Sequence, residues 1–134
     1  MIKIRTHITL PREEIWEYWT KPEHITHWNF ASPDWHCPEA KNDLRDGGVF
    51  SYRMAAKDGS MAFDFAGKHS KIETPMRISS VIDDGREMSI HFHPVLDGTE
   101  ITQRFEPESI NDPDLQEKGW QAILDNFKRY AESQ

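Results

Sequence analysis

The segment from Asp112 to Ala131 constrains the fold more than any other part of the sequence. On a helical wheel at about 100° per residue, its apolar and charged residues fall on opposite sides. The apolar side comprises Leu115, Gly119, Trp120, Ala122, Ile123, Leu124, Phe127, Tyr130 and Ala131, with Gln116 and Asn126 as polar interruptions. Because this side covers roughly half the circumference, it is wider than the stripe of about 100° that packs on a single neighbour. We therefore expect a long helix that lies in a concave partner or over a cavity.

The ends of this segment carry the signals of helix termini. Asp112 suits the N-cap, Pro113 suits the first helical position, and Asp114 complements the positive end of the helix dipole. Lys128 and Arg129 lie in the last turns, where positive charges are favourable. The helix is therefore predicted to begin directly after Asp112.

The first 35 residues predict one strand and two short helices. Isoleucine and threonine alternate with polar residues from Ile2 to Thr9, which indicates a strand with one buried face. Pro11 then precedes a helix over residues 12–19. The segment from Thr20 to Glu23 resembles a capping box and predicts a second helix that ends near Trp28, before a loop over 29–35.

From His36 to Glu106 the sequence predicts six strands joined by hairpin turns. The Asp58-Gly59 pair is the strongest short turn signal, as a two-residue loop. It pairs Met54 with Phe63, Tyr52 with Phe65, and Arg53 with Asp64. Apolar side chains then meet on one face and an ion pair forms on the other, as expected of cross-strand neighbours.

Three further glycine turns set the register of the remaining strands. A two-residue Asp97-Gly98 loop pairs Ile90 with Phe105, Phe92 with Gln103, Pro94 with Ile101, His91 with Arg104 and His93 with Thr102. At Gly85 a two-residue loop would mix the faces, whereas a three-residue loop with Gly85 left-handed pairs Ile82, Ile78 and Met76 with Arg86, Ile90 and Phe92. A three-residue loop over 46–48 pairs Leu44 with Phe50, Asn42 with Tyr52 and Ala40 with Met54. Since a one-residue slip turns every side chain to the other face, these turns decide which residues face the core.

One strand breaks the alternation. Met61, Phe63 and Phe65 share a face that Ile72 must also occupy if it is to meet Met76 across the next turn, but the parity of Ile72 differs. We therefore expect a β-bulge near Gly67, because a glycine inside a strand often marks one.

The predicted order is strand, two short helices, six antiparallel strands and one long helix, in a single domain over residues 1–134. Sequential hairpins form a meander with one apolar face, and only the terminal helix is long enough to cover it. The expected class is therefore α+β.

Charge and composition exclude several classes of partner. The net charge of −7 and the pI near 5.4 disfavour nucleic acid, which requires a basic surface. No apolar run is long enough to span a bilayer, and the first residues lack the apolar core of a signal peptide. A single cysteine, Cys37, allows no internal disulfide, so we expect a cytoplasmic protein.

Several short motifs, in this order and spacing, resemble those of the START-like (SRPBCC) superfamily, and in particular its branch related to the activator of a heat-shock chaperone ATPase. They are Pro11, Ile15-Trp16, Thr20, Pro22-Glu23 and Trp28, the run from Asp43 to Gly48, Gly98-Thr99, and Gly119-Trp120 with Leu124, Phe127 and Tyr130. The resemblance implies a helix-grip fold, in which a curved antiparallel sheet wraps around the C-terminal helix with a cavity between them. Members of the superfamily include lipid carriers, hormone receptors and polyketide cyclases, so the fold does not define the activity.

The predicted registers and this resemblance define a candidate ligand site. Its walls would be Tyr52, Met54, Phe63, Phe65, Ile78, Ile90, Phe92 and Phe105 from the sheet, Trp120, Ile123 and Leu124 from the helix, and Trp28 or Trp35 at the mouth, with the polar side chains of Asn42 and Gln103. Apolar walls with few polar groups are typical of small-molecule pockets. The alternative is a fully packed core in which Gln103 bonds to the backbone.

The histidines, the cysteine and the acidic pairs are interpreted as structural. His91 and His93 are spaced as metal ligands that His69 could join, but the register puts them on the polar face beside Arg104. His36 and Cys37 are adjacent in a strand and so point to opposite faces. We expect no catalytic residue, no metal site and no cofactor.

The sequence leaves three functions open. The first is a binding protein for a small hydrophobic molecule, aromatic or lipid-like. The second is a cyclase- or aromatase-like enzyme that uses Tyr52 or a histidine; it requires a titratable group in the cavity, for which only His69 is a candidate. The third, implied by the resemblance alone, is a module that contacts a chaperone. The exposed turn 45–48 and the tryptophan-bearing helices are candidate contact surfaces, and a homodimer is a further possibility.

Overall fold

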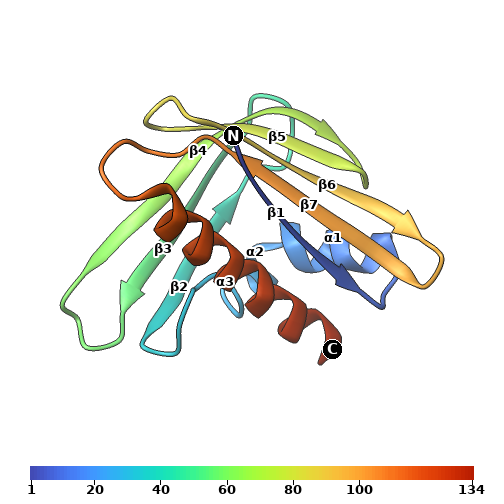
Figure 1. The fold of residues 1–134 in the computed structure, drawn as a ribbon, viewed down its shortest axis with the longest axis horizontal. Coiled ribbons are helices and arrows are strands. Elements are labelled where there is room, and N and C mark those ends of the chain that lie inside the picture. The colour runs from blue at the N-terminus through green and yellow to red at the C-terminus, as the bar shows by residue number, and fades with distance from the viewer.

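A computed structural model describes residues 1–134 and contains the predicted elements in the predicted order (Figure 1). The strands are β1 (Ile2–Ile8), β2 (Trp35–Asn42), β3 (Val49–Ala56), β4 (Ala62–Glu73), β5 (Arg77–Ile82), β6 (Glu87–Val95) and β7 (Gly98–Phe105). The helices are α1 (Arg12–Thr20), α2 (Pro22–Ile25) and α3 (Pro113–Glu132). The α+β helix-grip prediction is confirmed.

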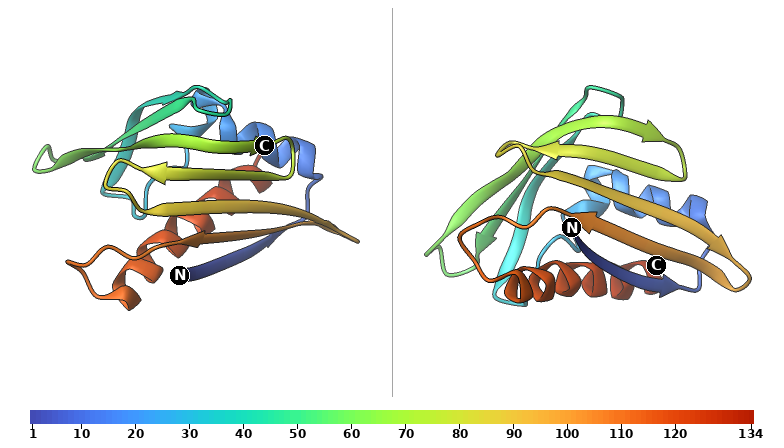
Figure 2. Two further views of the ribbon diagram at one scale, coloured as in Figure 1. Left: turned by 90° about the horizontal axis from the view of Figure 1, so that it is seen from above. Right: turned by 45° about the horizontal axis from the view of Figure 1, so that its top comes forward.

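All seven strands form one antiparallel sheet in the order β1-β7-β6-β5-β4-β3-β2. The six later strands form a meander, and β1 adds to its end by pairing with β7 from Ile2↔Phe105 to Ile8↔Thr99. The sheet curves, and α3 crosses its concave side while α1 and α2 sit toward one end (Figure 2). This arrangement lets a single helix cover a sheet that is wider than the helix.

The predicted start of α3 is confirmed, but its inward face differs from the wheel. The Asp112 side chain accepts a hydrogen bond from the Asp114 amide at 2.8 Å, and Pro113 occupies the first position. Leu115 is 62% exposed, although the wheel placed it on the apolar side. The buried position in the first turns is taken instead by Gln116, about 100° further around the helix.

Two of the predicted turns fix the register correctly. The Asp58-Gly59 turn aligns β3 and β4 with Met54↔Phe63, Tyr52↔Phe65 and Arg53↔Asp64. The three-residue turn at Gly85 aligns β5 and β6 with Ile78↔Ile90. Gly59 and Gly85 have φ of +79° and +93°, so each adopts the left-handed conformation that the turn requires.

The other two registers are wrong by two residues. Gly98 does not belong to the turn but begins β7, and it must be glycine because a Cβ there would lie 2.1 Å from the Ile8 carbonyl oxygen. The two-residue loop is therefore residues 96–97, one residue earlier than predicted, and Ile90 pairs with Gln103. Likewise Asn42 pairs with Phe50, because the connection between β2 and β3 is longer than three residues. Shifts of two residues leave the side chains on their predicted faces.

The predicted bulge in β4 is present, but it lies at 69–71 rather than at Gly67. His69 pairs with Ser80 and Lys71 with Ser79, so Ser70 is the extra residue. Through this bulge, β4 keeps Phe65, His69 and Ile72 on the concave side of the sheet.

The predicted capping box at Thr20 is wrong. Thr20 ends α1, and its hydroxyl donates to the Trp16 carbonyl at 2.7 Å instead of capping α2. Lys21 precedes α2, and Pro22 begins it. Separately, none of the three helices is both long and apolar enough to cross a membrane.

The core is concentrated where α1, α2 and the C-terminal half of α3 meet the sheet. Its members include Ile4, Ile8, Ile15, Trp16, Ile25, Trp28, Phe92, Ile101, Leu124, Phe127 and Ala131. The aromatic rings there meet mostly edge to face, as Trp16 does with Phe92 at a centroid distance of 5.5 Å. This part of the concavity is filled.

Candidate functional site

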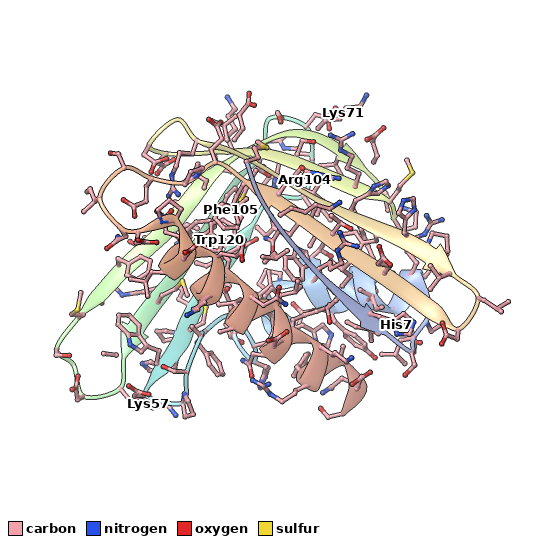
Figure 3. All side chains as sticks on the ribbon, viewed as in Figure 1. His7, Lys57, Lys71, Arg104, Phe105 and Trp120 are labelled. Carbon is pink, nitrogen blue, oxygen red and sulfur yellow. The ribbon has the colours of Figure 1, made fainter.

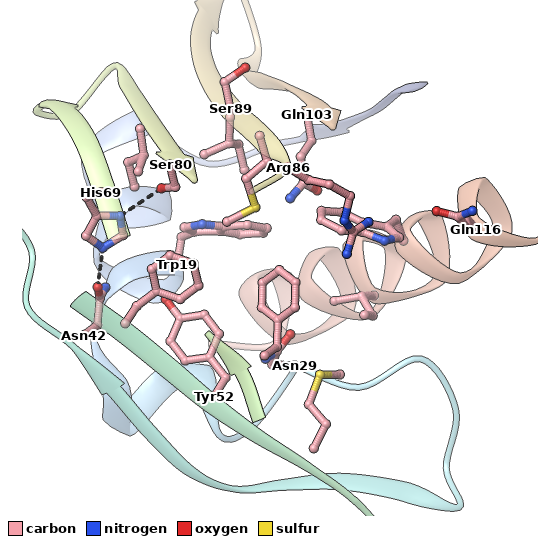
Figure 4. Close-up of a pocket in the computed structure, with 18 of the residues that line it drawn as sticks. Trp19, Asn29, Asn42, Tyr52, His69, Ser80, Arg86, Ser89, Gln103 and Gln116 are labelled. Atoms are coloured by element: carbon pink, nitrogen blue, oxygen red, sulfur yellow. Dashed lines mark hydrogen bonds between the residues drawn. The ribbon is translucent and has the colours of Figure 1, made fainter. Parts of the chain in front are cut away.

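The other part of the concavity is a cavity of about 410 Å³ between the sheet and the N-terminal half of α3 (Figure 4). Strands β2 to β7, α3 and the α1–α2 region all contribute side chains to its wall. Its size falls within the roughly 300–1,000 Å³ of small-molecule sites. The fully packed alternative is therefore wrong for this end of the molecule.

Most of the predicted site residues do line this cavity. They are Trp28, Asn42, Tyr52, Met54, Phe63, Phe65, Ile78, Ile90, Gln103, Trp120 and Ile123. They come together because alternate positions of adjacent strands face the concave side, as the turn-based registers predicted. Phe63 is 48% exposed and so forms part of the rim.

The remaining predicted wall residues do not reach the cavity. Phe105 faces the concave side but is covered by Trp120, whose ring stacks on it at 3.8 Å (Figure 3). Phe92 and Leu124 belong to the filled end and are fully buried there. Trp35 lies near the rim against Phe63, with ring centroids 6.0 Å apart.

The sequence analysis missed several residues of the wall. They are Trp19, Asn29, Phe50, Ser80, Arg86, Met88, Ser89, Glu108, Asn111 and Gln116, whereas His69, named only as the candidate titratable group of an enzyme, is also in the wall. Ser80 shares a strand face with Ile78 and Ile82, so the alternation of β5 could have identified it. The face of the sheet on which His69 lies could not be predicted without the position of the bulge. Whether Trp19 reaches the cavity depends on how α1 packs on the sheet.

A chain of hydrogen bonds forms one end of the cavity. The Asn42 amide nitrogen donates to the Thr20 carbonyl at 2.8 Å, and the Asn42 side-chain oxygen lies 2.7 Å from His69 Nε2. His69 Nδ1 lies 2.9 Å from Ser80 Oγ (Figure 4). Both ring nitrogens of His69 therefore have a protein partner, and one of these partners, Ser80, also lines the cavity.

The turn over 45–48 holds the backbone of His69. The Gly47 amide donates to the His69 carbonyl, and the His69 amide donates to the Gly48 carbonyl, both at 2.8 Å. Gly48 cannot carry a side chain, because a Cβ would lie 2.0 Å from the Asp43 carbonyl oxygen. The turn that was a candidate contact surface thus has a structural role in positioning His69.

Burial favours the uncharged form of two titratable groups of the wall, His69 and Tyr52. It lowers the pKa of the His69 imidazole, on whose ring Phe50 stacks, and the carboxylate of Asp43 opposes this effect only in part. Burial also raises the pKa of the Tyr52 phenol. The Tyr52 hydroxyl and the Gln103 amide make no hydrogen bond within the protein, so both are free to bind a ligand.

Arg86 and Glu108 are the charged side chains of the wall. Arg86 donates to Asp84 Oδ2 at 2.8 Å and to the Glu106 carbonyl at 3.3 Å. The carboxylate of Glu108 accepts from the amides of Ile110 and Asn111 in its own loop. These charges are therefore already partnered.

The other histidines and the cysteine lie apart from this wall. The rings of His91 and His93 are 4.3 Å apart on the outer face of β6, whereas His69 faces the concave side. The three therefore do not form a common metal site. Burial raises the pKa of the Cys37 thiol, which favours its protonated form rather than a nucleophilic thiolate.

Comparison with known protein families gives a match over almost the whole chain. Residues 9–132 match the family described as Activator of Hsp90 ATPase homolog 1-like protein. The chain belongs to this family. As an AHSA1-like protein it lies in the branch of the START-like superfamily that its sequence motifs indicated.

Solved structures of related proteins agree with this AHSA1-like assignment. The solution structure of an AHSA1-like protein from Aeromonas hydrophila is 46% identical, covers 98% of this chain and 92% of its own, and superposes with a TM-score of 0.94. A solution structure from Cytophaga hutchinsonii is also 46% identical, with the same coverage and a TM-score of 0.85. A crystal structure from Nitrosomonas europaea, at 19% identity, 98% and 94% coverage and a TM-score of 0.84, shares the fold alone. A search of proteins with curated functions found no match.

Proposed function

We propose that this AHSA1-like protein binds a small, largely apolar and uncharged molecule, aromatic or lipid-like, between the sheet and α3. The observation that supports the proposal best is the cavity of about 410 Å³, whose exposed wall is mainly apolar and whose polar side chains include the hydrogen-bonded set of Asn42, His69 and Ser80 at one end. Sites of this composition typically bind small molecules through buried apolar area and use the polar groups for orientation.

The shape and charge of the wall favour a flat, neutral ligand. Trp120 and Phe65 meet edge to face at 5.7 Å, so their rings form two faces of a corner against which a planar molecule can pack. The charged side chains Arg86 and Glu108 are already bonded to their own loops, so neither requires a charged ligand. A neutral aromatic body therefore fits better than an ion.

Tryptophan fluorescence tests this proposal directly, because Trp19, Trp28 and Trp120 line the cavity. We expect neutral two- and three-ring aromatic compounds to quench this fluorescence and to raise the melting temperature, since a ligand that binds only the folded state stabilises it. A panel of aromatic compounds and fatty acids that gives neither quenching nor a thermal shift would overturn the proposal.

A pair of matched variants separates cavity binding from surface binding. Phe65→Trp adds volume inside the cavity, whereas Phe63→Trp adds the same volume at the rim, where the side chain is half exposed. We expect the first variant to weaken binding by more than about tenfold, because extra atoms in a filled site cost roughly 1–3 kcal/mol. The second should change affinity little. Mass spectrometry of molecules that co-purify from the native host would then identify the natural ligand.

A cyclase-like enzyme is the second candidate function, and the inward position of His69 favours it. Because both ring nitrogens are occupied, His69 can exchange a proton with a ligand only through Ser80. The test is to incubate candidate polyketone substrates with the protein and with His69→Gln, and to follow product by mass spectrometry. If the wild type converts a substrate and His69→Gln does not, the protein is an enzyme. If no substrate is converted, binding is the function that remains.

A further inference from the structure

The directions of the hydrogen bonds at the end of the cavity can be deduced from its first member. The nitrogen of the Asn42 amide donates to the carbonyl of Thr20, which cannot itself donate. Reversing the amide would set two oxygen atoms against each other at 2.8 Å. The oxygen of the Asn42 amide therefore faces His69.

This orientation determines where the proton of His69 lies. The ring nitrogen that faces Asn42, at 2.7 Å, must carry hydrogen because its partner is an acceptor. In a neutral imidazole the other nitrogen is then an acceptor, and at 2.9 Å it receives the hydroxyl proton of Ser80.

This arrangement determines what Ser80, the last residue in the series of hydrogen bonds, can offer to a ligand. Its only hydroxyl proton points to His69, so toward any ligand that reaches it the oxygen can offer lone pairs but no hydrogen. Ser80 is 2% exposed and lines the cavity, so bulk water has little access to it. If Ser80 turned its proton toward a ligand, the buried nitrogen of His69 would lose its partner, which is costly in such an environment.

We propose that this end of the cavity selects ligands that carry an uncharged hydrogen-bond donor, such as a phenolic hydroxyl, which donates to Ser80 Oγ. The inference rests on the proposed binding function and specifies the ligand class. A donor extends the chain through Ser80, His69 and Asn42 to Thr20, and each bond polarises the next. A carboxylate or phenolate would instead set its negative oxygen against the lone pairs of Ser80. The apolar body of the ligand would lie against Tyr52 and the aromatic wall.

The experiment compares naphthol, whose hydroxyl donates, with methoxynaphthalene, whose oxygen only accepts, and with naphthalene itself. Near neutral pH we expect naphthol to bind roughly 2- to 10-fold more tightly than methoxynaphthalene, which is the usual worth of one hydrogen bond. Ser80→Ala should bring this ratio to about one. Ser79→Ala is the matched control, because Ser79 is the neighbouring serine on the same strand and is absent from the cavity wall; it should retain the preference.

A second variant tests the direction of these hydrogen bonds without removing Ser80. Asn42→Asp places a negative charge beside His69 and favours the imidazolium, whose second N–H then donates to Ser80. Its other carboxylate oxygen replaces the nitrogen that donates to the Thr20 carbonyl, so this variant should also melt at a lower temperature than the wild type. The Ser80 hydroxyl would turn its proton to the cavity, and the preference should reverse in favour of methoxynaphthalene.

The outcomes distinguish this inference from the proposed function. If all three compounds bind the wild type equally, or if the preference for naphthol survives Ser80→Ala, the inference is overturned while ligand binding stands. If none of them binds, the inference is overturned, and the other aromatic compounds and the fatty acids of the wider panel then decide the proposed function. A preference that disappears in Ser80→Ala and reverses in Asn42→Asp would establish it.

Discussion

The two halves of α3 cover the same sheet with opposite results. Around Leu124, Phe127 and Ala131 the concavity is filled, and these three side chains are fully buried. Around Gln116, Trp120 and Ile123 the helix covers a cavity of about 410 Å³. Both halves present large side chains to the sheet, so the amount of apolar surface on the helix does not explain the difference.

The difference comes from what lies between the helix and the sheet. At the filled end, the α1–α2 region supplies tryptophans that pack on Phe127, with ring centroids 4.9 Å away for both Trp19 and Trp28. At the other end Trp120 itself reaches the sheet, where it stacks on Phe105 at 3.8 Å and meets Phe65 edge to face at 5.7 Å. The short helices thus set the boundary between core and cavity.

The largest expected effect tests this contrast within α3. Phe127→Ala should lower the free energy of unfolding by about 3–5 kcal/mol, because it opens a void in a packed aromatic cluster. Ile123→Ala, one turn earlier on the cavity wall, should cost about 1 kcal/mol, because it only enlarges an existing space. Urea unfolding measures both. Equal losses would mean that the two halves of the helix are packed alike.

An intermediate effect concerns Gln116, which holds the loop at the cavity edge. Its side chain accepts from the Glu108 amide at 2.9 Å and donates to the carbonyls of Glu108 and Asn111 at 3.0 and 2.9 Å. Gln116→Leu should therefore cost about 1–3 kcal/mol and speed hydrogen exchange at the Glu108 amide. Glu117→Leu, at the exposed next position of α3, is the control and should cost less than about 0.5 kcal/mol. Slow exchange at Glu108 in Gln116→Leu would show that the loop is held by other contacts.

The smallest effect is a pH dependence that comes from the cavity end. Because the pKa of His69 is lowered in the folded state, the unfolded chain binds more protons as pH falls below about 6.5. The free energy of unfolding therefore has the full His69 contribution above that pH. It decreases as the pH falls toward the lower pKa that His69 has in the folded protein. His91 acts in the same direction, since burial and the neighbouring His93 also lower its pKa.

Nuclear magnetic resonance separates the two histidines. The ring signals of His69 should titrate below the range of an unperturbed histidine, and a saturating neutral ligand should shift the His69 titration but not that of His91, which lies on the outer face. A ligand that shifted the pKa of His91 instead would bind at the outer face of the sheet, which would contradict the proposed site.

The sequence predicted the fold and most of the cavity because local rules determine them. Glycines with positive φ at 59 and 85 lie in the turns where the pattern placed them, and the faces of the strands followed. Gly98 was misplaced in a turn because its true constraint is the Ile8 backbone, which approaches from a distant strand. The covering of Phe105 by Trp120 and the arrival of Trp19 from α1 depend on how the helices dock, which no local pattern specifies.

The extra residue in β4 has an evolutionary consequence. Ser70 lets both His69 and Ile72 face inward although they are three positions apart. Loss of that one codon would force either the imidazole or the residues near the next turn to rotate toward solvent, while the sheet itself could persist. A relative of this protein that lacks the insertion would keep the architecture and lose the polar anchor, so a change in gene length of three nucleotides would suffice to alter what the scaffold holds.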